Sequence, residues 1–303
     1  MSDFQASQCI RFSALARAVE GLTQWRPLVL GLLSVVLASA LAALGTVVAV
    51  GGGLGTLLAG MLSLLVLVVL FGGISAVGVM LMDQARGVPV RSLAQAAWRG
   101  VQCIPKFLGF ALVLCALGLA FAAVAAVLYW LCQIPYLGVV LAFVVHPALV
   151  LLGAGLLMAV GLVAAPLFAP AVWSGLGLKA ALAQLVRIVS KRWLQVVVML
   201  LVLYLLLMVV SGILALGLVP ALASLTSLAA TILAQGPAVG LYADAWLSPA
   251  ALLWGGMSSG AMGAALMGLG VLMLAVGALL MQVWMLGLNL LYLQVADGQE
   301  AEN

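Results

Sequence analysis

The chain has 303 residues, of which 67% are hydrophobic and only 6% are charged. A soluble domain carries about 25% charged residues, so this composition excludes a soluble globular enzyme, a disordered chain and a disulfide scaffold. The net charge is +4, but no solvated domain gathers the basic residues, which excludes a nucleic-acid partner. The composition predicts an integral membrane protein.

The four cysteines show no CxxC spacing and no nearby histidine at the spacing of metal ligands. They are Cys9, Cys103, Cys115 and Cys132. We expect them to behave as small apolar residues, and we expect no disulfide, no metal site and no cofactor.

All eleven cationic residues fall into three clusters separated by long apolar runs. The clusters are Arg11, Arg17 and Arg26; Arg86, Arg91, Arg99 and Lys106; and Lys179, Arg187, Lys191 and Arg192. The first run, Pro27–Met82, would be about 84 Å long as a helix, enough to cross a hydrocarbon core of about 30 Å twice. Glycines near its midpoint predict the turn between the two crossings. These glycines are Gly51, Gly52, Gly53 and Gly55.

The second run, Phe107–Leu178, also lies between cationic clusters, so an even number of crossings is expected and two fit. The third run contains two clear spans, Leu194–Leu218 and Ala261–Tyr292. Between them, Val219–Ala234 contains a proline and several hydroxyl side chains, so we expect an interfacial or re-entrant helix there. A full crossing by that segment would give seven spans. Six crossings are therefore predicted.

In this six-span arrangement every Lys and Arg lies on one face of the membrane, and the positive-inside rule assigns that face to the cytoplasm. Both termini, including the short polar tail 297–303, are then expected in the cytoplasm.

The cationic clusters align with one another as amphipathic helices, each followed by a transmembrane hairpin. Short Ala-Leu-Ala or Ser-Leu-Ala motifs begin at Ala14, Ser92 and Ala181, and apolar residues follow each at i, i+3, i+4 and i+7. Chance is the alternative, since Ala and Leu are abundant. The predicted fold is an all-α polytopic membrane bundle, a single domain over 1–303, with six transmembrane helices arranged as three repeats of cytoplasmic amphipathic helix plus hairpin. The repeat units are 12–82, 91–174 and 179–294.

The amphipathic helices are expected to lie along the cytoplasmic leaflet, where each Lys or Arg contributes about 1 kcal/mol of attraction to anionic headgroups. Plain anchoring and orientation of the chain is the alternative to recognition of a specific lipid. The side chains predicted to contact a headgroup or a partner are Arg17, Arg91, Arg99, Lys106, Arg187 and Lys191.

No ionisable residue falls near the middle of a predicted span, which argues against a catalytic or transport site. Asp83 is expected to pair with Arg86 at the inner end of the second span. His146 falls near the outer end of the fourth span, where a solvated interfacial histidine is expected. Gln282 and Asn289 lie seven residues apart on one helix face, so they are predicted to make a polar contact between helices or to line a narrow polar path.

The segment Gly256-Met257-Ser258-Ser259-Gly260 fits the GxSxG pattern and superficially resembles the Ser-Gly element of rhomboid intramembrane proteases. A serine nucleophile needs a histidine base, and rhomboids place theirs downstream of the serine, whereas the histidine of this chain lies upstream. A catalytic role is therefore rejected. Close packing against a neighbouring helix is predicted instead for the small residues Gly256, Gly260 and Gly263.

The segment 82–93, Met-Asp-Gln-Ala-Arg-Gly-Val-Pro-Val-Arg-Ser-Leu, follows a predicted hairpin and precedes a predicted amphipathic helix. With this layout the chain resembles uncharacterised polytopic inner-membrane families of bacteria, and it is similar to the membrane domain that accompanies glycerophosphoryl diester phosphodiesterases. The catalytic carboxylates and histidines of the phosphodiesterase domain have no counterpart in this sequence. The resemblance implies a six-helix bundle of the bacterial inner membrane, with no catalytic residue to carry over.

The leading functional hypothesis is a non-enzymatic scaffold or accessory subunit that contacts anionic lipid on the cytoplasmic side and a membrane-protein partner or a second copy of itself. The alternative is a transporter or channel for an apolar or uncharged small molecule, with Gln282 and Asn289 facing the path. An intramembrane hydrolase acting through Ser258 or Ser259 is not expected, because the base is missing.

Overall fold

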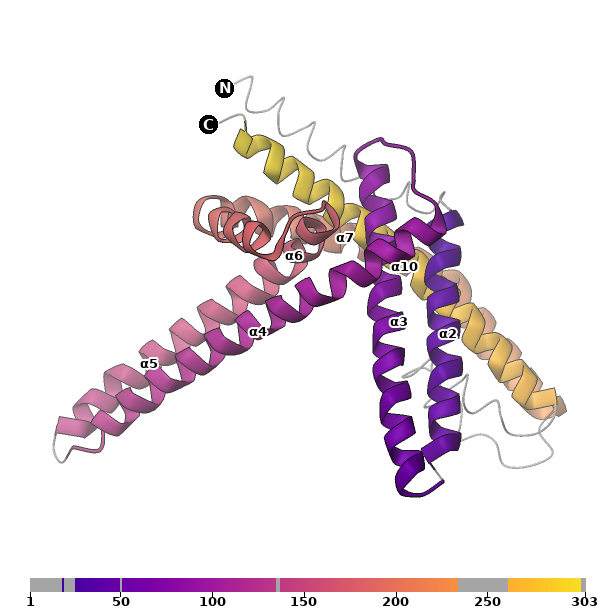
Figure 1. Ribbon diagram of the computed structural model, residues 1–303, viewed down its shortest axis with the longest axis horizontal. Coiled ribbons are helices and arrows are strands. Elements are labelled where there is room, and N and C mark those ends of the chain that lie inside the picture. The colour runs from indigo at the N-terminus through magenta and orange to yellow at the C-terminus, as the bar shows by residue number, and fades with distance from the viewer. Residues whose placement is uncertain (1–17, 19–24, 50, 135–136, 234–260, 301–303) are drawn as a thin grey trace. The chain divides into compact units, whose positions relative to one another are not determined.

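The computed structural model describes residues 18, 25–49, 51–134, 137–233 and 261–300. Within these ranges every regular element is helical, so the all-α class is confirmed (Figure 1). The elements in chain order are α2 (Trp25–Ala49), α3 (Gly53–Ala85), α4 (Leu93–Leu131), α5 (Leu137–Met158), the π-helical segment η2 (Ala159–Ala164), α6 (Ala165–Trp173), α7 (Leu178–Leu233) and α10 (Ala261–Glu300).

Six stretches of these helices are long and apolar enough to cross a membrane, which confirms the predicted number within the described residues. Long apolar helices suit a bilayer because each satisfies its backbone hydrogen bonds internally. The six stretches are Trp25–Ala49, Gly53–Ala85, Leu93–Leu131, Leu141–Trp173, Trp193–Leu225 and Gly268–Ala296.

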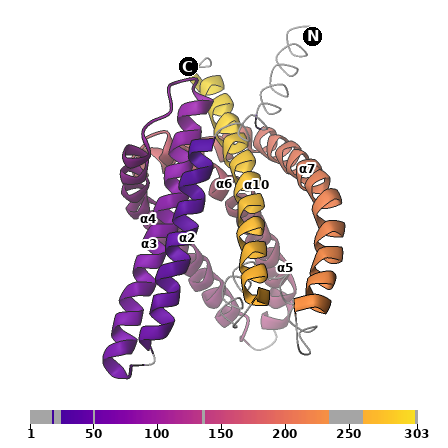
Figure 2. The same cartoon turned by 90° about the vertical axis from the view of Figure 1, so that its right-hand side faces the viewer.

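Helices α2 and α3 form the predicted hairpin and lie side by side in both views (Figures 1 and 2). The turn uses Gly52, whose φ of 82° favours glycine, and Gly51, whose N–H donates to the Val48 carbonyl at 3.0 Å. A Cβ on Gly55 would collide with that same carbonyl oxygen. The glycines therefore have two different roles in the turn: Gly52 supplies the positive φ, and Gly55 leaves room for the Val48 carbonyl.

The basic segments before the third and fifth spans are not separate helices. Arg99 lies in α4, which runs without a break through Pro105 into the span. Lys179 and Arg187 lie at the start of α7, which likewise continues into its span. A continuous helix pairs its backbone N–H and C=O groups internally where the chain enters the apolar phase, apart from the one donor that Pro105 lacks in α4. The alignment of these segments with the leaflet and the threefold repeat stay predictions.

Residues 219–233 differ from the expectation of a separate interfacial or re-entrant helix, because they continue α7 as far as Leu233. Pro220 lies inside this helix, where it removes one N–H donor but keeps a helical φ. Ser224 donates its hydroxyl to the Pro220 carbonyl at 2.9 Å. The Ser224 hydroxyl is thus satisfied by a carbonyl of its own helix, so it does not require the helix to end.

The chain divides into two compact units that interleave along the sequence. One unit comprises residues 1–101 and 202–290, and the other comprises residues 102–201 and 291–303. These boundaries do not coincide with those of the predicted repeats.

In the first unit, the second half of α3 is its most buried part, from Ser75 to Asp83. Small residues let neighbouring helices approach its backbone: Gly31 of α2 faces Val77, and Gly100 of α4 faces Ala76. The core of this unit is therefore built on close contacts between helix backbones.

In the second unit, the aromatic ring of Phe168 on α6 connects α6 with α4. It stacks on Phe110 with the ring centroids 4.0 Å apart and meets Phe107 edge-on at 5.5 Å. On the same unit, the Tyr292 hydroxyl of α10 donates to the Gln184 side chain of α7 at 2.7 Å.

Candidate functional site

Two of the basic residues that the sequence predicts as lipid or partner contacts, Arg99 and Arg187, have exposed side chains. Neither forms an ion pair with a described residue. Two others, Arg91 and Lys106, contact other parts of the chain. The remaining two, Arg17 and the side chain of Lys191, lie outside the described residues. The described residues of the predicted set are therefore of two kinds: Arg99 and Arg187 are exposed, and Arg91 and Lys106 make contacts within the chain.

Asp83 forms an ion pair with Arg91, whose Nε lies 3.0 Å from Oδ2. The Asp83 residue is 4% exposed, whereas the Arg91 side chain is 37% exposed. Oδ2 has no aligned hydrogen bond, so Coulombic attraction dominates the contact. The sequence predicted Arg86 as the partner, whereas the ion pair of the structure is with Arg91. The chain turns back after α3 and so brings Arg91 to Asp83: Gly87 has a φ of 71°, and the Val88 N–H donates to the Asp83 carbonyl at 3.0 Å.

Lys106 donates a hydrogen bond from Nζ to the Leu176 carbonyl at 3.0 Å. Leu176 lies just beyond α6, where Gly175 adopts a φ of 102° and ends the helix. Carbonyl groups at a helix C-terminus carry partial negative charge and favour a cation. Lys106 therefore connects α4 to the chain that leaves α6, both within the second unit.

Replacement of Lys106 by Met keeps the apolar stem and removes the ammonium group, so it should reduce the free energy of unfolding by about 1 kcal/mol. The measurement is thermal unfolding in mild detergent, followed by tryptophan fluorescence. Lys179→Met is the matched control, because Lys179 is exposed and has no described partner. Equal melting temperatures for the two variants would mean that the Leu176 contact adds no stability.

Gln282 and Asn289, predicted to share one face of a helix, are both buried in α10, with 2% and 0% exposure. Asn289 donates from Nδ2 to the Gly78 carbonyl of α3 at 3.2 Å, and its Oδ1 has no partner among the described residues. Of the two roles that the sequence leaves open, Asn289 therefore makes a contact between helices.

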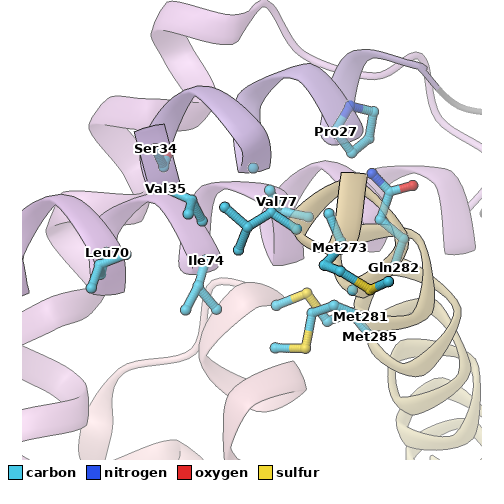
Figure 3. Close-up of a pocket in the computed structure, with 14 residues that line it drawn as sticks. Pro27, Ser34, Val35, Leu70, Ile74, Val77, Met273, Met281, Gln282 and Met285 are labelled. Carbon is cyan, nitrogen blue, oxygen red and sulfur yellow. The ribbon is translucent and has the colours of Figure 1, made fainter. Parts of the chain in front are cut away.

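Gln282 borders a pocket of about 340 Å³ among α2, α3 and α10, all within the first unit (Figure 3). The other lining side chains are apolar except for Ser34, whose hydroxyl donates to the Leu30 carbonyl of its own helix at 2.8 Å. Asn289 is not among the lining residues. Pockets of about 300–1,000 Å³ with few polar groups are typical of small-molecule sites.

The glycines predicted for close packing fall mostly beyond what the structure covers: Gly256 and Gly260 lie outside the described residues, and Gly263 lies in the first turns of α10. Close approaches occur at other glycines, which the sequence analysis did not identify. A Cβ on Gly100 would meet the Gly72 carbonyl oxygen, and one on Gly287 would meet the Leu203 side chain.

Groups able to perform chemistry are few in the described part of the chain. His146 Nδ1 lies 2.8 Å from the hydroxyl of Tyr129, as a hydrogen-bonded pair in the α4/α5 hairpin. The described residues contain no group of three His, Cys, Asp or Glu side chains that could hold a metal ion. Ser258 and Ser259 of the GxSxG segment lie outside the described residues.

Comparison with known proteins gave no match among protein-family models, curated proteins or solved structures. The fold itself defines the class: a multi-pass, all-helical integral membrane protein with six apolar helices of spanning length in its described part. The candidate binding sites on this structure are the exposed cations and the apolar pocket.

Proposed function

We propose that the protein is a non-enzymatic scaffold or accessory subunit of the bacterial inner membrane, whose basic segments contact anionic headgroups or a partner at the cytoplasmic face. One observation supports this most strongly: Arg99, Lys179 and Arg187 are exposed, without an ion-pair partner among the described residues, on helices that continue into apolar spans. Such cations are attracted to anionic lipid because acidic headgroups supply the missing counter-charge. The layout that resembles bacterial inner-membrane families is in keeping with this location.

The start of α4 supports the same proposal through its two faces. Ala96, Gly100 and Cys103 are buried at i, i+4 and i+7, whereas Gln95 and Arg99 are exposed. This spacing is typical of a helix that packs on one side, and its outward side carries Gln95 and Arg99 together with the exposed Trp98. The proposal also includes three further points. The basic segments face the cytoplasm, the chain contains a threefold repeat, and the protein binds a membrane-protein partner or a second copy of itself.

The test is a triple variant, Arg99→Gln with Lys179→Gln and Arg187→Gln, purified in mild detergent. Each cation contributes about 1 kcal/mol near an anionic surface, so the enrichment of phosphatidylglycerol over phosphatidylethanolamine among copurifying lipids should fall at least tenfold. The control variant, Arg99→Lys with Arg187→Lys, keeps every charge and should keep the enrichment. An unchanged lipid profile in the triple variant, together with unchanged copurifying proteins, would contradict the proposal.

A second candidate function, transport of an apolar or uncharged small molecule, is favoured by the pocket beside Gln282. Asn289 does not support it, since this side chain is fully buried and bonded to Gly78. Reconstituted protein that carries an uncharged solute across a vesicle membrane would establish this function, and absence of flux over a broad panel of solutes would exclude it.

A further inference from the structure

The pocket of the first unit runs along the membrane-spanning part of α2. Its lining on α2 extends from Pro27 to Val35, which corresponds to about 12 Å of helical rise. One leaflet is about half of a 30 Å hydrocarbon core, so the pocket is nearly as long as a leaflet is thick. Its opposite wall is formed by Ile74 and Val77 of α3 and by Met281 of α10 (Figure 3).

The size of the pocket suits a hydrocarbon chain. A cavity of about 150 Å³ holds a benzene molecule, so a pocket of about 340 Å³ has room for about a dozen carbon atoms. Met273, Met281 and Met285 contribute flexible, polarizable walls, which adapt to apolar ligands of irregular shape. Ile74 and Met281 at its rim are also exposed to the surroundings, so in a bilayer the pocket is accessible from the hydrocarbon phase.

The two ends of the pocket differ in chemistry. Gln282 lies beside Pro27 at one end, and the other end, near Leu70, contains Ser34 as its one polar side chain (Figure 3). The Ser34 hydroxyl donates to the Leu30 carbonyl of its own helix. Pro27 follows Arg26, an exposed cation 5.8 Å from the centre of the Trp25 ring. Paired tryptophan and arginine side chains at the end of a span are typical of the headgroup region. The lining contains no acidic residue, so the charge at this end favours an anionic headgroup.

We propose that this pocket binds one acyl chain of an anionic phospholipid. The chain lies between α2, α3 and α10, its ester region lies at Gln282, and its headgroup lies at Arg26. Filling the pocket restores the dispersion contacts that an empty space would forfeit. This lipid site rests on the membrane-spanning helices alone and does not depend on the scaffold function proposed above.

The test uses phosphatidylglycerol that carries a photoreactive diazirine in one acyl chain, with the full-length protein in nanodiscs. In the wild-type protein, cross-links should map to lining residues, foremost Ile74, Met281 and Met285. Gly277→Phe should reduce these cross-links at least fivefold, because Gly277 lines the pocket and the added ring would compete with the acyl chain for space; the Cβ itself would have nothing within 4 Å. Gly268→Phe is the matched control on the same helix, since its Cβ site is equally open but lies outside the pocket.

A second experiment tests the preference for an anionic headgroup. Phosphatidylcholine with the same diazirine chain should label the pocket at least fivefold less than phosphatidylglycerol, and Arg26→Gln should remove that difference. Equal labelling of the wild-type protein by both lipids would contradict the preference for an anionic headgroup.

Other outcomes would contradict the binding site itself. Equal labelling of Gly277→Phe and Gly268→Phe would mean that the lipid is only part of the layer surrounding the protein. A photoreactive amino acid at position 74 that captures residues 1–24 or a second copy of the chain also overturns it. If Gly277→Phe fails to fold, the wild-type map decides, since cross-links that avoid the lining contradict the proposal. The Gln triple variant of the exposed cations leaves this labelling unchanged even where the scaffold proposal fails.

Discussion

Replacement of Arg91 by Gln is expected to destabilise the protein more than replacement of its partner, Asp83→Asn. Removing one member of a buried ion pair costs about 3–5 kcal/mol, and an exposed pair contributes about 0–1 kcal/mol. Because Arg91 is about one-third exposed, we expect Arg91→Gln to cost about 2–3 kcal/mol. The asymmetry follows from burial: Asp83, at 4% exposure, cannot regain water when its counter-charge is removed, whereas Arg91 can.

The measurement is thermal unfolding of the purified variants in one mild detergent. The double variant, Asp83→Asn with Arg91→Gln, should recover most of the stability that Arg91→Gln loses, because neither charge remains. Arg99→Gln serves as the control, since it removes an exposed cation with no described partner. A loss in Asp83→Asn equal to or greater than that in Arg91→Gln would show that the carboxylate is not held by Arg91.

This ion pair also marks a limit of what the sequence predicts. An ion pair for Asp83 was predictable from its position beside a cationic cluster, and the structure shows one. The partner Arg91 was not predictable, because helical spacing of three residues points to Arg86 and eight residues of sequence do not show where the chain goes next. The positive φ of Gly87 returns the chain toward α3 and brings Arg91 to Asp83. Turn geometry thus decides between two arginines that composition cannot distinguish.

The crossings were predictable because hydrophobic length and glycine content are local properties. The α2/α3 turn falls at the glycines that the sequence indicates, and six spans occur in the described residues. The boundaries within long helices were not predictable in the same way. Pro220 suggested an interruption, yet α7 passes through it, because an apolar environment makes broken backbone hydrogen bonds more costly than one missing donor.

The pocket could not be predicted from local sequence, because the position of α10 beside the α2/α3 hairpin is not a local property. Gly31 and Ile74 lie on the two helices of the predicted α2/α3 hairpin, whereas Met281 lies on α10, far along the chain from both. Gln282 alone carried a signal, as a polar residue in an apolar span. Its surroundings depend on which helices meet, and hydropathy patterns do not specify that.

Replacement of Gly100 by Ala should separate the start of α4 from α3 and reduce the free energy of unfolding by about 2–3 kcal/mol. The added Cβ would collide with the Gly72 carbonyl oxygen and would lie 2.7 Å from the Ala76 nitrogen. Backbone atoms cannot rotate away from such a contact, so one helix has to move. The measurement is again thermal unfolding in detergent, with folding checked by size-exclusion chromatography.

Two further glycines make this prediction specific to the contact partner. Gly287→Ala should cost less than Gly100→Ala, since its Cβ would meet the Leu203 side chain, which can change rotamer. Gly118→Ala on α4 has nothing within 4 Å and should be neutral or stabilising by up to about 1 kcal/mol, because Ala favours helix over Gly. The expected order of stability loss is therefore Gly100, then Gly287, then Gly118. If all three variants were equally stable, helix propensity rather than backbone approach would govern these positions, and α4 and α3 would not be in close contact at Gly100.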